Sequence, residues 1–319
     1  MVVKRLPSIM LFILVIFILG CDGESSSNNQ DKVTGVCSNQ AIPFEQTIFL
    51  KNGYHIYLIG DTGTGDSNQV FSAEILEKYH LQYPLDAIIH SGDIFYPAGI
   101  NSASDANVEE KFNGIYDSLA LDNIPWYLVA GNHDHEGSIA ALQDFAAQSP
   151  LLNYPSRYFL HQLHKNGLSW QLNLIAIDTT PFTHNANQLE QLSWLEQQLA
   201  QNSQNINIVV GHHPVFSNGS HGDTSPLKAS FLDLLRFYQV PLYLSGHEHS
   251  LEILQNKAGP TYVISGAGGQ TLRDIECAES SLYAAQEFGG IALFITSTSI
   301  GLIPVTQTSL VMMFQLPLR

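Results

Sequence analysis

Polar side chains that can bind metal ions recur in this sequence, each directly after a short apolar run. Five such places follow one another: Gly60-Asp61, Gly92-Asp93 with Tyr96, Gly131-Asn132-His133, Gly211-His212 and Gly246-His247-Glu248-His249. Two carboxylates, a phenol, an amide and several imidazoles suit two hard or borderline cations that share one carboxylate. One Gly-Asp pair is a weak signal, because it is also an ordinary turn, but five in order predict a dinuclear metal site.

The elements between these places predict how the polar groups are brought together. Strand-like runs cover residues 54–60, 85–89, 126–130, 174–178, 206–210 and 241–244, and helix-like runs cover about 68–81, 108–119, 188–201 and 226–238. This alternation predicts a layered α/β sandwich, and the β-rich pattern from Leu251 onward predicts a second sheet packed on the first. Sites in such sheets form outside the carboxyl ends of strands, so we expect the five groups at one edge.

Histidines are unusually frequent, and 13 of them match the 13 lysines and arginines together. His247 and His249 are two residues apart, so both side chains can point to one side of an extended backbone. His135 and His213 lie beside candidate ligands and are equally consistent with holding those ligands in place or with no role at the site. The remaining histidines are expected at the surface or hydrogen-bonded in the core: His55, His80, His90, His161, His164 and His184.

The N-terminal residues predict export. Residues 9–19 form an apolar run after Lys4 and Arg5, too short for a membrane span of about 20 residues and typical of a signal peptide at residues 1–20. The run ends Ile-Leu-Gly-Cys21, which resembles a bacterial lipoprotein box and predicts a lipid anchor on Cys21. A cleaved signal without a lipid is the alternative. The polar residues that follow predict a tether over 21–43 and one large folded domain over 44–319, held at the cell envelope or in the periplasm.

Charge and cysteine content narrow the possible partners. The formal net charge is −16, and loss of Lys4 and Arg5 leaves 11 basic against 29 acidic residues, or −18. So acidic a chain is a poor binder of nucleic acid, because phosphate backbones need a basic surface. Cys37 and Cys277 remain if Cys21 carries a lipid, and they either form one disulfide or stay as separate thiols.

The motifs GDTG, GDIFY, GNHD, GHHP and GHEH together resemble the purple acid phosphatases of the calcineurin-like metallophosphoesterases. The likeness is to the small tartrate-resistant type and extends from about residue 54 to the end. It implies a four-layer α-β-β-α sandwich, with Fe(III) and a divalent metal (Fe, Zn or Mn) at the site. By resemblance, iron is held by Asp61, Tyr96 and His249, the divalent metal by Asn132, His212 and His247, and both by Asp93. The same resemblance places His133 and His221 against the phosphate or its leaving group.

Two departures from related enzymes are informative. Metallophosphoesterases without the purple chemistry place a histidine two residues after the first aspartate, where this chain has Gly63. Tyr96 supplies a ligand instead, and a phenol with an ordinary pKa of about 10 needs a strongly acidic metal to ionise near neutrality, which favours Fe(III). The animal enzymes also carry a long loop whose cleavage activates them. Only residues 179–190 occupy that stretch here, which predicts activity without proteolysis.

The expected function is hydrolysis of small phosphate monoesters by an acid phosphatase. A metal-dependent phosphodiesterase is the alternative within enzymes. A non-catalytic phosphate-binding lipoprotein is the alternative in another class. His133 and His221 favour an enzyme, because a protein that only binds phosphate does not need proton donors.

Overall fold

The computed structural model describes residues 34–38, 40–43, 52–184, 186, 188–256, 259–308 and 312–318. The chain divides into two units, Met1–Lys32 and Val33–Arg319, and only the second contains described residues. The predicted signal peptide, the lipid anchor on Cys21 and the tether up to residue 33 therefore lie outside the described residues. No helix in the described ranges is both long and apolar enough to cross a bilayer.

Two eight-stranded sheets form the centre of the domain. Sheet A has the order β1 (Thr34–Val36), β13 (Ser281–Ala285), β11 (Leu251–Gln255), β12 (Thr261–Ser265), β10 (Leu242–Ser245), β9 (Ile206–Val210), β8 (Leu172–Ala176) and β7 (Phe159–Leu163). Sheet B has the order β2 (Ala41–Pro43), β16 (Met312–Pro317), β15 (Ser299–Thr306), β14 (Gly289–Ile295), β3 (Tyr54–Ile59), β4 (Ala87–His90), β5 (Trp126–Leu128) and β6 (Leu152–Asn153). The strands that carry the candidate site are parallel neighbours: β3, β4 and β5 in sheet B, and β9 and β10 in sheet A.

The helices flank the two sheets. They are α1 (Ser67–Gln82), α2 (Ala106–Val108), η1 (Glu109–Asn113), α3 (Gly114–Tyr116), α4 (Asn132–Glu136), α5 (Ile139–Ala146), α6 (Thr180–Thr183), α7 (Leu189–Gln201) and α8 (Ser225–Phe237). The helix predicted over 108–119 is displaced and irregular, because a π-helical turn at η1 brings the N–H of Gly114 to the carbonyl of Glu109. Helices α4 and α5 were not predicted, since they are short and α4 has no apolar repeat.

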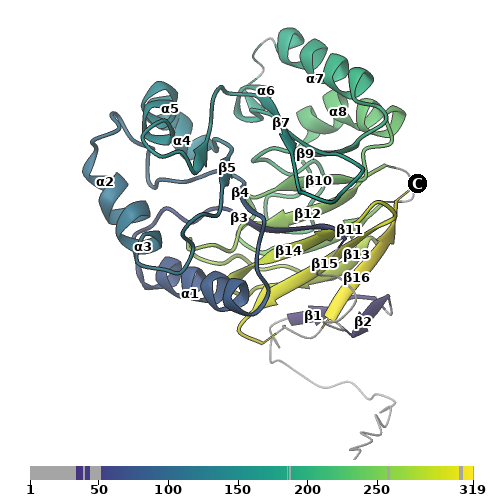
Figure 1. Ribbon diagram of the computed structural model, residues 1–319, viewed down its shortest axis with the longest axis horizontal. Helices are drawn as coiled ribbons and strands as arrows, with labels where there is room; N and C mark the ends of the chain where they lie inside the picture. Colours follow the sequence, from purple (N-terminus) through teal and green to yellow (C-terminus); the bar gives the residue numbers. More distant parts are fainter. Residues whose placement is uncertain are drawn as a thin grey trace, which may run out of the picture. The chain divides into compact units, whose positions relative to one another are not determined.

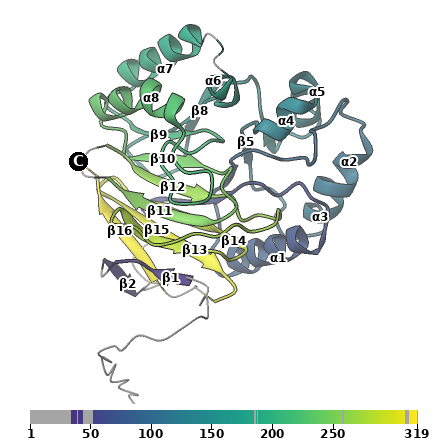
Figure 2. The same ribbon diagram turned by 180° about the vertical axis from the view of Figure 1, so that it is seen from behind.

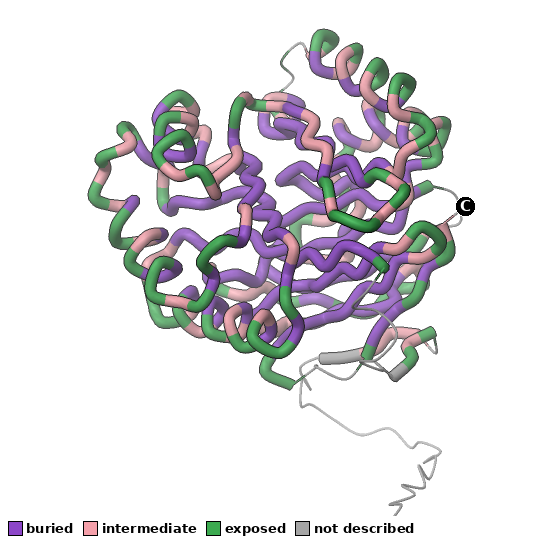
Figure 3. Tube along the Cα trace, in the orientation of Figure 1, coloured by how far each residue is buried: buried purple, intermediate pink, exposed green. Residues whose placement is uncertain are grey.

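Alternate residues of the central strands face different layers. On β9, Ile208 and Val210 belong to the core between the sheets, whereas Val209 belongs to the core under α7 and α8. This is the period of two that a strand imposes on its side chains. Figures 1 and 2 show α7 and α8 together beside sheet A and α1 to α5 on the other side of the domain. The strands are buried and the outer helix faces exposed (Figure 3), as the four-layer α-β-β-α prediction requires.

The start of the folded domain differs from the prediction. Thr34–Val36 pairs with β13, and Ala41–Pro43 pairs with β16, so part of the predicted tether forms edge strands. Cys37, between these strands, forms a disulfide with Cys277. Of the two alternatives for the cysteines, the structure therefore has the disulfide. Edge pairing depends on backbone groups and on this covalent link, neither of which leaves an apolar pattern in the sequence.

Candidate metal centre

The five predicted strand ends meet at one place. Asp61 follows β3, Asp93 follows β4, and Asn132 begins α4 after β5. From the other sheet, His212 follows β9 and His247 follows β10. Because these strands run parallel within their sheets, their carboxyl ends share an edge, and the side chains beyond them face one another.

One half of the site is built around the Tyr96 hydroxyl. Its oxygen lies 2.9 Å from Asp93 Oδ2, 3.1 Å from Asp61 Oδ1 and 3.3 Å from His249 Nε2. Ligand atoms at right angles on bonds of roughly 2.1 Å lie about 3 Å apart. The four side chains therefore have the spacing of donors around a single cation.

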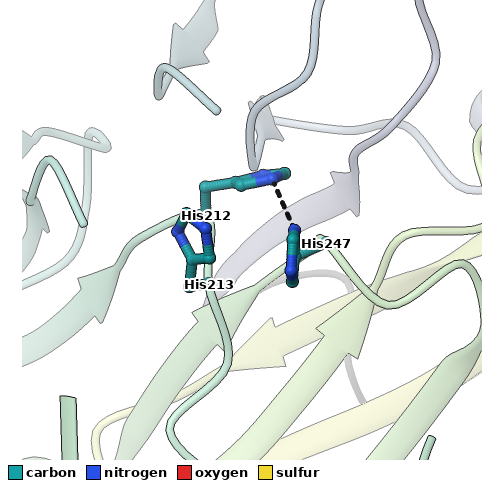
Figure 4. A group of neighbouring side chains, drawn as sticks. All are labelled: His212, His213 and His247. Atoms are coloured by element: carbon teal, nitrogen blue, oxygen red, sulfur yellow. Dashed lines mark hydrogen bonds between the residues drawn. The ribbon is translucent and has the colours of Figure 1, made fainter. Parts of the chain in front are cut away.

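The other half is built around the Asn132 carbonyl. Its Oδ1 lies 3.0 Å from His212 Nε2 and 3.0 Å from His247 Nδ1, and these two nitrogens are 3.3 Å apart. Figure 4 shows the His212 and His247 rings facing each other through these atoms. His212 Nε2 is also 3.4 Å from Asp93 Oδ2, the oxygen that contacts Tyr96 in the first half. Asp93 is thus placed to be shared by two cations.

Backbone carbonyls fix which ring nitrogens face the site. His212 Nδ1 lies 2.9 Å from the carbonyl of Ser91, and His249 Nδ1 lies 2.9 Å from the carbonyl of Thr271. A carbonyl can only accept, so each Nδ1 carries a hydrogen and each Nε2 is the nitrogen that faces the cluster and can bind a cation once it is deprotonated. Both imidazoles therefore have the tautomer that metal binding requires, and the donor set fits two cations.

Without bound cations, burial and the neighbouring charged groups shift the pKa values of the candidate ligands strongly. Burial, reinforced by Asp93, raises the pKa of Asp61, and burial and the two carboxylates raise the pKa of Tyr96. Burial also acts to raise the pKa of Asp93, but the adjacent His212 outweighs it and holds that pKa below its usual range. Burial of His212 acts to lower its pKa, but Asp93 outweighs this effect and raises the pKa of His212 to about 9. Bound cations would take the place of the proton on His212 and allow Asp61, Asp93 and Tyr96 to ionise together.

Three of the candidate ligands have left-handed backbone conformations. The φ angles are 57° at Asp61, 53° at Asp93 and 67° at His247. Such values are uncommon outside glycine and cost of order 1–3 kcal/mol each, and they concentrate at functional sites. The turns after β3, β4 and β10 thus hold the candidate ligands in strained conformations.

The structure also explains why residue 63 is glycine. A Cβ atom at Gly63 would lie 2.1 Å from the carbonyl oxygen of Ile94, so no side chain fits there. A histidine at this position, as in metallophosphoesterases without the purple chemistry, is incompatible with the local backbone. The Tyr96 hydroxyl lies among the candidate ligands Asp61, Asp93 and His249 instead.

The two predicted catalytic histidines lie in different surroundings. His221 lines an open cavity of about 630 Å³ together with Asn132 and His247. The backbone N–H of His133 donates to Asp93 Oδ1 at 2.9 Å, and its ring packs at 4.5 Å on the ring of Tyr96. His133 is not among the residues that line this cavity, so His221 is the better placed of the two to meet a leaving group there.

The histidines beside the ligands contact the site differently from each other. His213 lies beside His247, with ring centroids 4.4 Å apart and the ring planes tilted by 43° (Figure 4), while its Nδ1 lies 2.9 Å from Thr179 Oγ1. His135 lies on the cavity wall and is bound through Nε2 to the buried carboxylate of Asp178, 2.9 Å away. His213 therefore contacts a candidate ligand and also lines the cavity, whereas His135 contributes to the cavity wall alone.

Most of the other histidines have the structural roles expected of them. His55 Nε2 lies 2.8 Å from the Tyr79 hydroxyl, and His90 Nε2 lies 2.8 Å from Thr62 Oγ1, both inside the core. His184 is exposed, as expected, and it also lines the cavity together with residues of α6. The described part of the short stretch 179–190 thus forms a wall of the cavity.

Other residues at the site were missed by sequence reasoning. Asp134 accepts hydrogen bonds from the backbone of Ile94, Phe95 and Gly131, and so ties two ligand-bearing turns together. Burial, with a contribution from Asp93, raises the pKa of Asp134 to about 7. Its place within GNHD was an available signal. Arg273, which donates to the carbonyl of His247 at 2.8 Å, comes from a distant loop with no motif.

Comparison with known families and proteins identifies relatives of this chain. Residues 54–251 match the calcineurin-like phosphoesterase family. The chain is 36% identical over 198 residues to tartrate-resistant acid phosphatase type 5 from Mus musculus, covering 57% of this chain and 61% of that protein. It is 32% identical over 238 residues to purple acid phosphatase 17 from Arabidopsis thaliana, covering 68% of each. The chain thus spans only about three fifths of the length of the animal relatives it matches.

Solved structures share the fold at lower identity. The anchor of the inner membrane complex of Plasmodium superposes with a TM-score of 0.75 at 19% identity, over 84% of this chain and 90% of that one. A purple acid phosphatase from seeds of yellow lupin, Lupinus luteus, superposes with a TM-score of 0.61 at 15% identity, over 83% and 54%. At these identities the likeness shows the fold alone. The family match over residues 54–251 and the plant relative show that the chain belongs to the calcineurin-like phosphoesterases and, within them, to the purple acid phosphatases.

Proposed function

We propose that the protein is an acid phosphatase that hydrolyses small phosphate monoesters with a centre of Fe(III) and a divalent metal. Asp61, Tyr96 and His249 would hold the iron, and Asp93 would be shared. The divalent ion, Fe, Zn or Mn, would be held by Asn132, His212 and His247. The observation that carries this proposal is the arrangement of these donors in two groups joined by one carboxylate oxygen.

When bound, the two cations supply positive charge that attracts and polarises a phosphate group and lowers the pKa of water. Three ionised side chains, Asp61, Asp93 and Tyr96, would offset only part of that charge. About two positive charges then remain for an anionic phosphate in a largely buried setting. This balance favours a monoester dianion over a neutral ligand.

The protein's own groups manage the protons of the reaction. In hydrolysis a water oxygen becomes bonded to phosphorus, and the bond between phosphorus and the ester oxygen breaks. The departing alkoxide takes a proton, and His221, on the cavity wall, is placed to give it. His133, packed on Tyr96 and bonded to Asp93 through its backbone, is placed to orient the ligands beside the phosphate.

Turnover and metal content test this proposal together. Protein purified without chelator should hydrolyse nitrophenyl phosphate fastest on the acid side of neutrality, much faster than bis-nitrophenyl phosphate, and without prior proteolysis. Chelation should abolish the activity, and iron with zinc or manganese should restore it. Preference for the bis ester would indicate a phosphodiesterase. Metal binding with no turnover of either ester would indicate a phosphate-binding protein.

We further propose that the protein is exported and anchored to a membrane by a lipid on Cys21. The apolar run at residues 9–19 supports export, and the disulfide between Cys37 and Cys277 suits an oxidising compartment. Cys21→Ser should move the protein from the membrane fraction to the soluble fraction of cells, with its turnover unchanged. Identical fractionation of the variant and the wild type would exclude the anchor.

A further inference from the structure

The loop that carries His221, residues 216–223, is bound by two buried glutamates. Glu252, on β11, accepts from Ser217 Oγ at 2.6 Å and from the backbone N–H of Asn218 at 2.9 Å. Glu248, between the ligands His247 and His249, accepts from Ser220 Oγ at 3.0 Å. Its other oxygen lies 2.8 Å from the backbone nitrogen of His221 and 3.0 Å from its Nδ1. Two carboxylates thus bind consecutive parts of one loop.

Burial of these two glutamates lowers the stability of the fold. Both are 0% exposed, and a buried carboxylate without a close cation is unfavourable. Among the described residues, the permanently charged partner of Glu248 is Arg273, with Nη1 3.8 Å from Oε1, and His221 Nδ1 lies closer to the other oxygen, at 3.0 Å. The hydrogen-bond donors to Glu252 are neutral. Burial raises the pKa of Glu252 to about 7. Apolar side chains would fill the same space at a lower cost in free energy. The two buried glutamates therefore indicate that the loop over 216–223 must be held in a fixed position.

The glutamates also determine how His221 presents its ring. His221 Nδ1 lies 3.0 Å from Glu248 Oε2 and 2.8 Å from Arg273 Nη1, and because a carboxylate only accepts and a guanidinium only donates, Nδ1 bonds one of them at a time. The backbone N–H of His221 donates to Glu248 in either case. Nε2 is directed away from both groups, and among the described residues no hydrogen bond occupies it. The ring stacks on His247 with centroids 4.6 Å apart, although the His221 side chain is 41% exposed. A Cβ at Gly219 would lie 2.2 Å from Glu248 Cγ, so glycine allows the loop to come this close. An exposed side chain is therefore held in one orientation on the cavity wall.

We infer that Glu248 is a positioning residue for His221, and that Glu252 anchors the same loop so that the imidazole meets the leaving group. This inference rests on the proposed phosphatase function. A proton donor matters most when the departing oxygen is strongly basic, as in an alkyl phosphate, and little for nitrophenolate. Loss of the glutamate should therefore be selective for substrates with poor leaving groups.

The test compares an alkyl phosphate with nitrophenyl phosphate across four variants of the intact protein. Glu248→Gln keeps an oxygen for both His221 contacts and should remain within a few-fold of wild type. Glu248→Ala should lower kcat for the alkyl phosphate roughly 10-fold or more, which is part of the roughly 100- to 10,000-fold that general acid catalysis contributes, with little change for nitrophenyl phosphate. His221→Ala should show the same selectivity. Ser220→Ala, which removes one Glu248 contact but none of His221, is the control and should behave as wild type.

The double variant Glu248→Ala/His221→Ala distinguishes positioning of His221 from support of the metal ligands. If Glu248 acts through His221, the double variant should be no worse than His221→Ala, because groups that act as a unit are not additive. Its metal content should equal that of wild type. Equal loss for both substrates, additive effects or loss of metal would show that Glu248 supports the ligands, and would overturn this inference alone. A wild type inactive on both substrates would refute the proposed function, and this inference with it.

Discussion

Asp93→Asn should cause the protein to lose metal from both halves of its site and nearly all of its activity. One Asp93 oxygen lies 2.9 Å from the Tyr96 hydroxyl and 3.4 Å from His212 Nε2, so a single carboxylate serves both groups of donors. Loss of a group that only supports a ligand typically costs roughly 10–100-fold in affinity or activity, and loss of a shared ligand should cost more. The measurement is metal content per chain beside turnover of nitrophenyl phosphate.

A matched variant separates this effect from a general loss of charge. Asp144→Asn removes an exposed carboxylate on α5, away from the ligands, and should leave metal content and turnover at wild-type levels. The Asp93 variant should also remain folded, because asparagine keeps the size of the side chain and can still accept from the backbone N–H of His133. An Asp93→Asn protein that retained both metals and full activity would show that this residue is not the shared ligand.

The ligand positions were predictable because the α/β architecture determines where strand ends meet. Asp61, Asp93 and His212 each follow a glycine at the end of a buried parallel strand, and such ends share one edge of a sheet. The apolar runs identify the strands, and the polar residue that breaks each run identifies the end. Local sequence was therefore sufficient to predict both the sandwich and the convergence of its candidate ligands.

The supporting contacts were not predictable in the same way, because they join residues without a shared local pattern. Arg273 reaches the carbonyl of His247 from a loop, and Thr271 in that loop offers its backbone oxygen to His249. Neither contact depends on a motif. The role of Glu248 was hidden between two ligands in GHEH, where its neighbours account for the motif by themselves. The edge strand Thr34–Val36 was hidden because its pairing uses backbone groups alone.

The buried polar residues around the ligands share one physical purpose. Asp134 ties the turns after β4 and β5 together, and Glu248 and Glu252 tie the loop of His221 to β11 and the turn before it. Each is buried, and each accepts backbone N–H groups of a loop that regular secondary structure does not hold. Rigid loops keep donors at the spacing that cations and phosphate require, and this outweighs the cost of burying the carboxylates.

Tyr96→Phe should bleach the protein while leaving part of its activity. Phenolate donates electron density into Fe(III) and gives a visible charge-transfer band, whereas carboxylate and imidazole do so far less visibly. Wild-type protein should therefore be purple or pink. The variant loses one anionic ligand but keeps Asp61, Asp93 and His249, whose donor atoms surround the phenol oxygen at 3.1, 2.9 and 3.3 Å. Iron should remain bound more weakly.

The measurement is the visible absorption spectrum of protein loaded with iron, recorded beside iron content and turnover. Tyr127→Phe is the matched control, because the Tyr127 hydroxyl lies 2.8 Å from His161 Nε2 and does not contact the ligands. Its colour should equal that of wild type. Loss of colour in Tyr96→Phe with iron still bound would identify the phenolate as the source of the band. A colourless, fully active wild type that is unaffected by Tyr96→Phe would show that Tyr96 binds no iron, and the Fe(III) assignment would then be wrong.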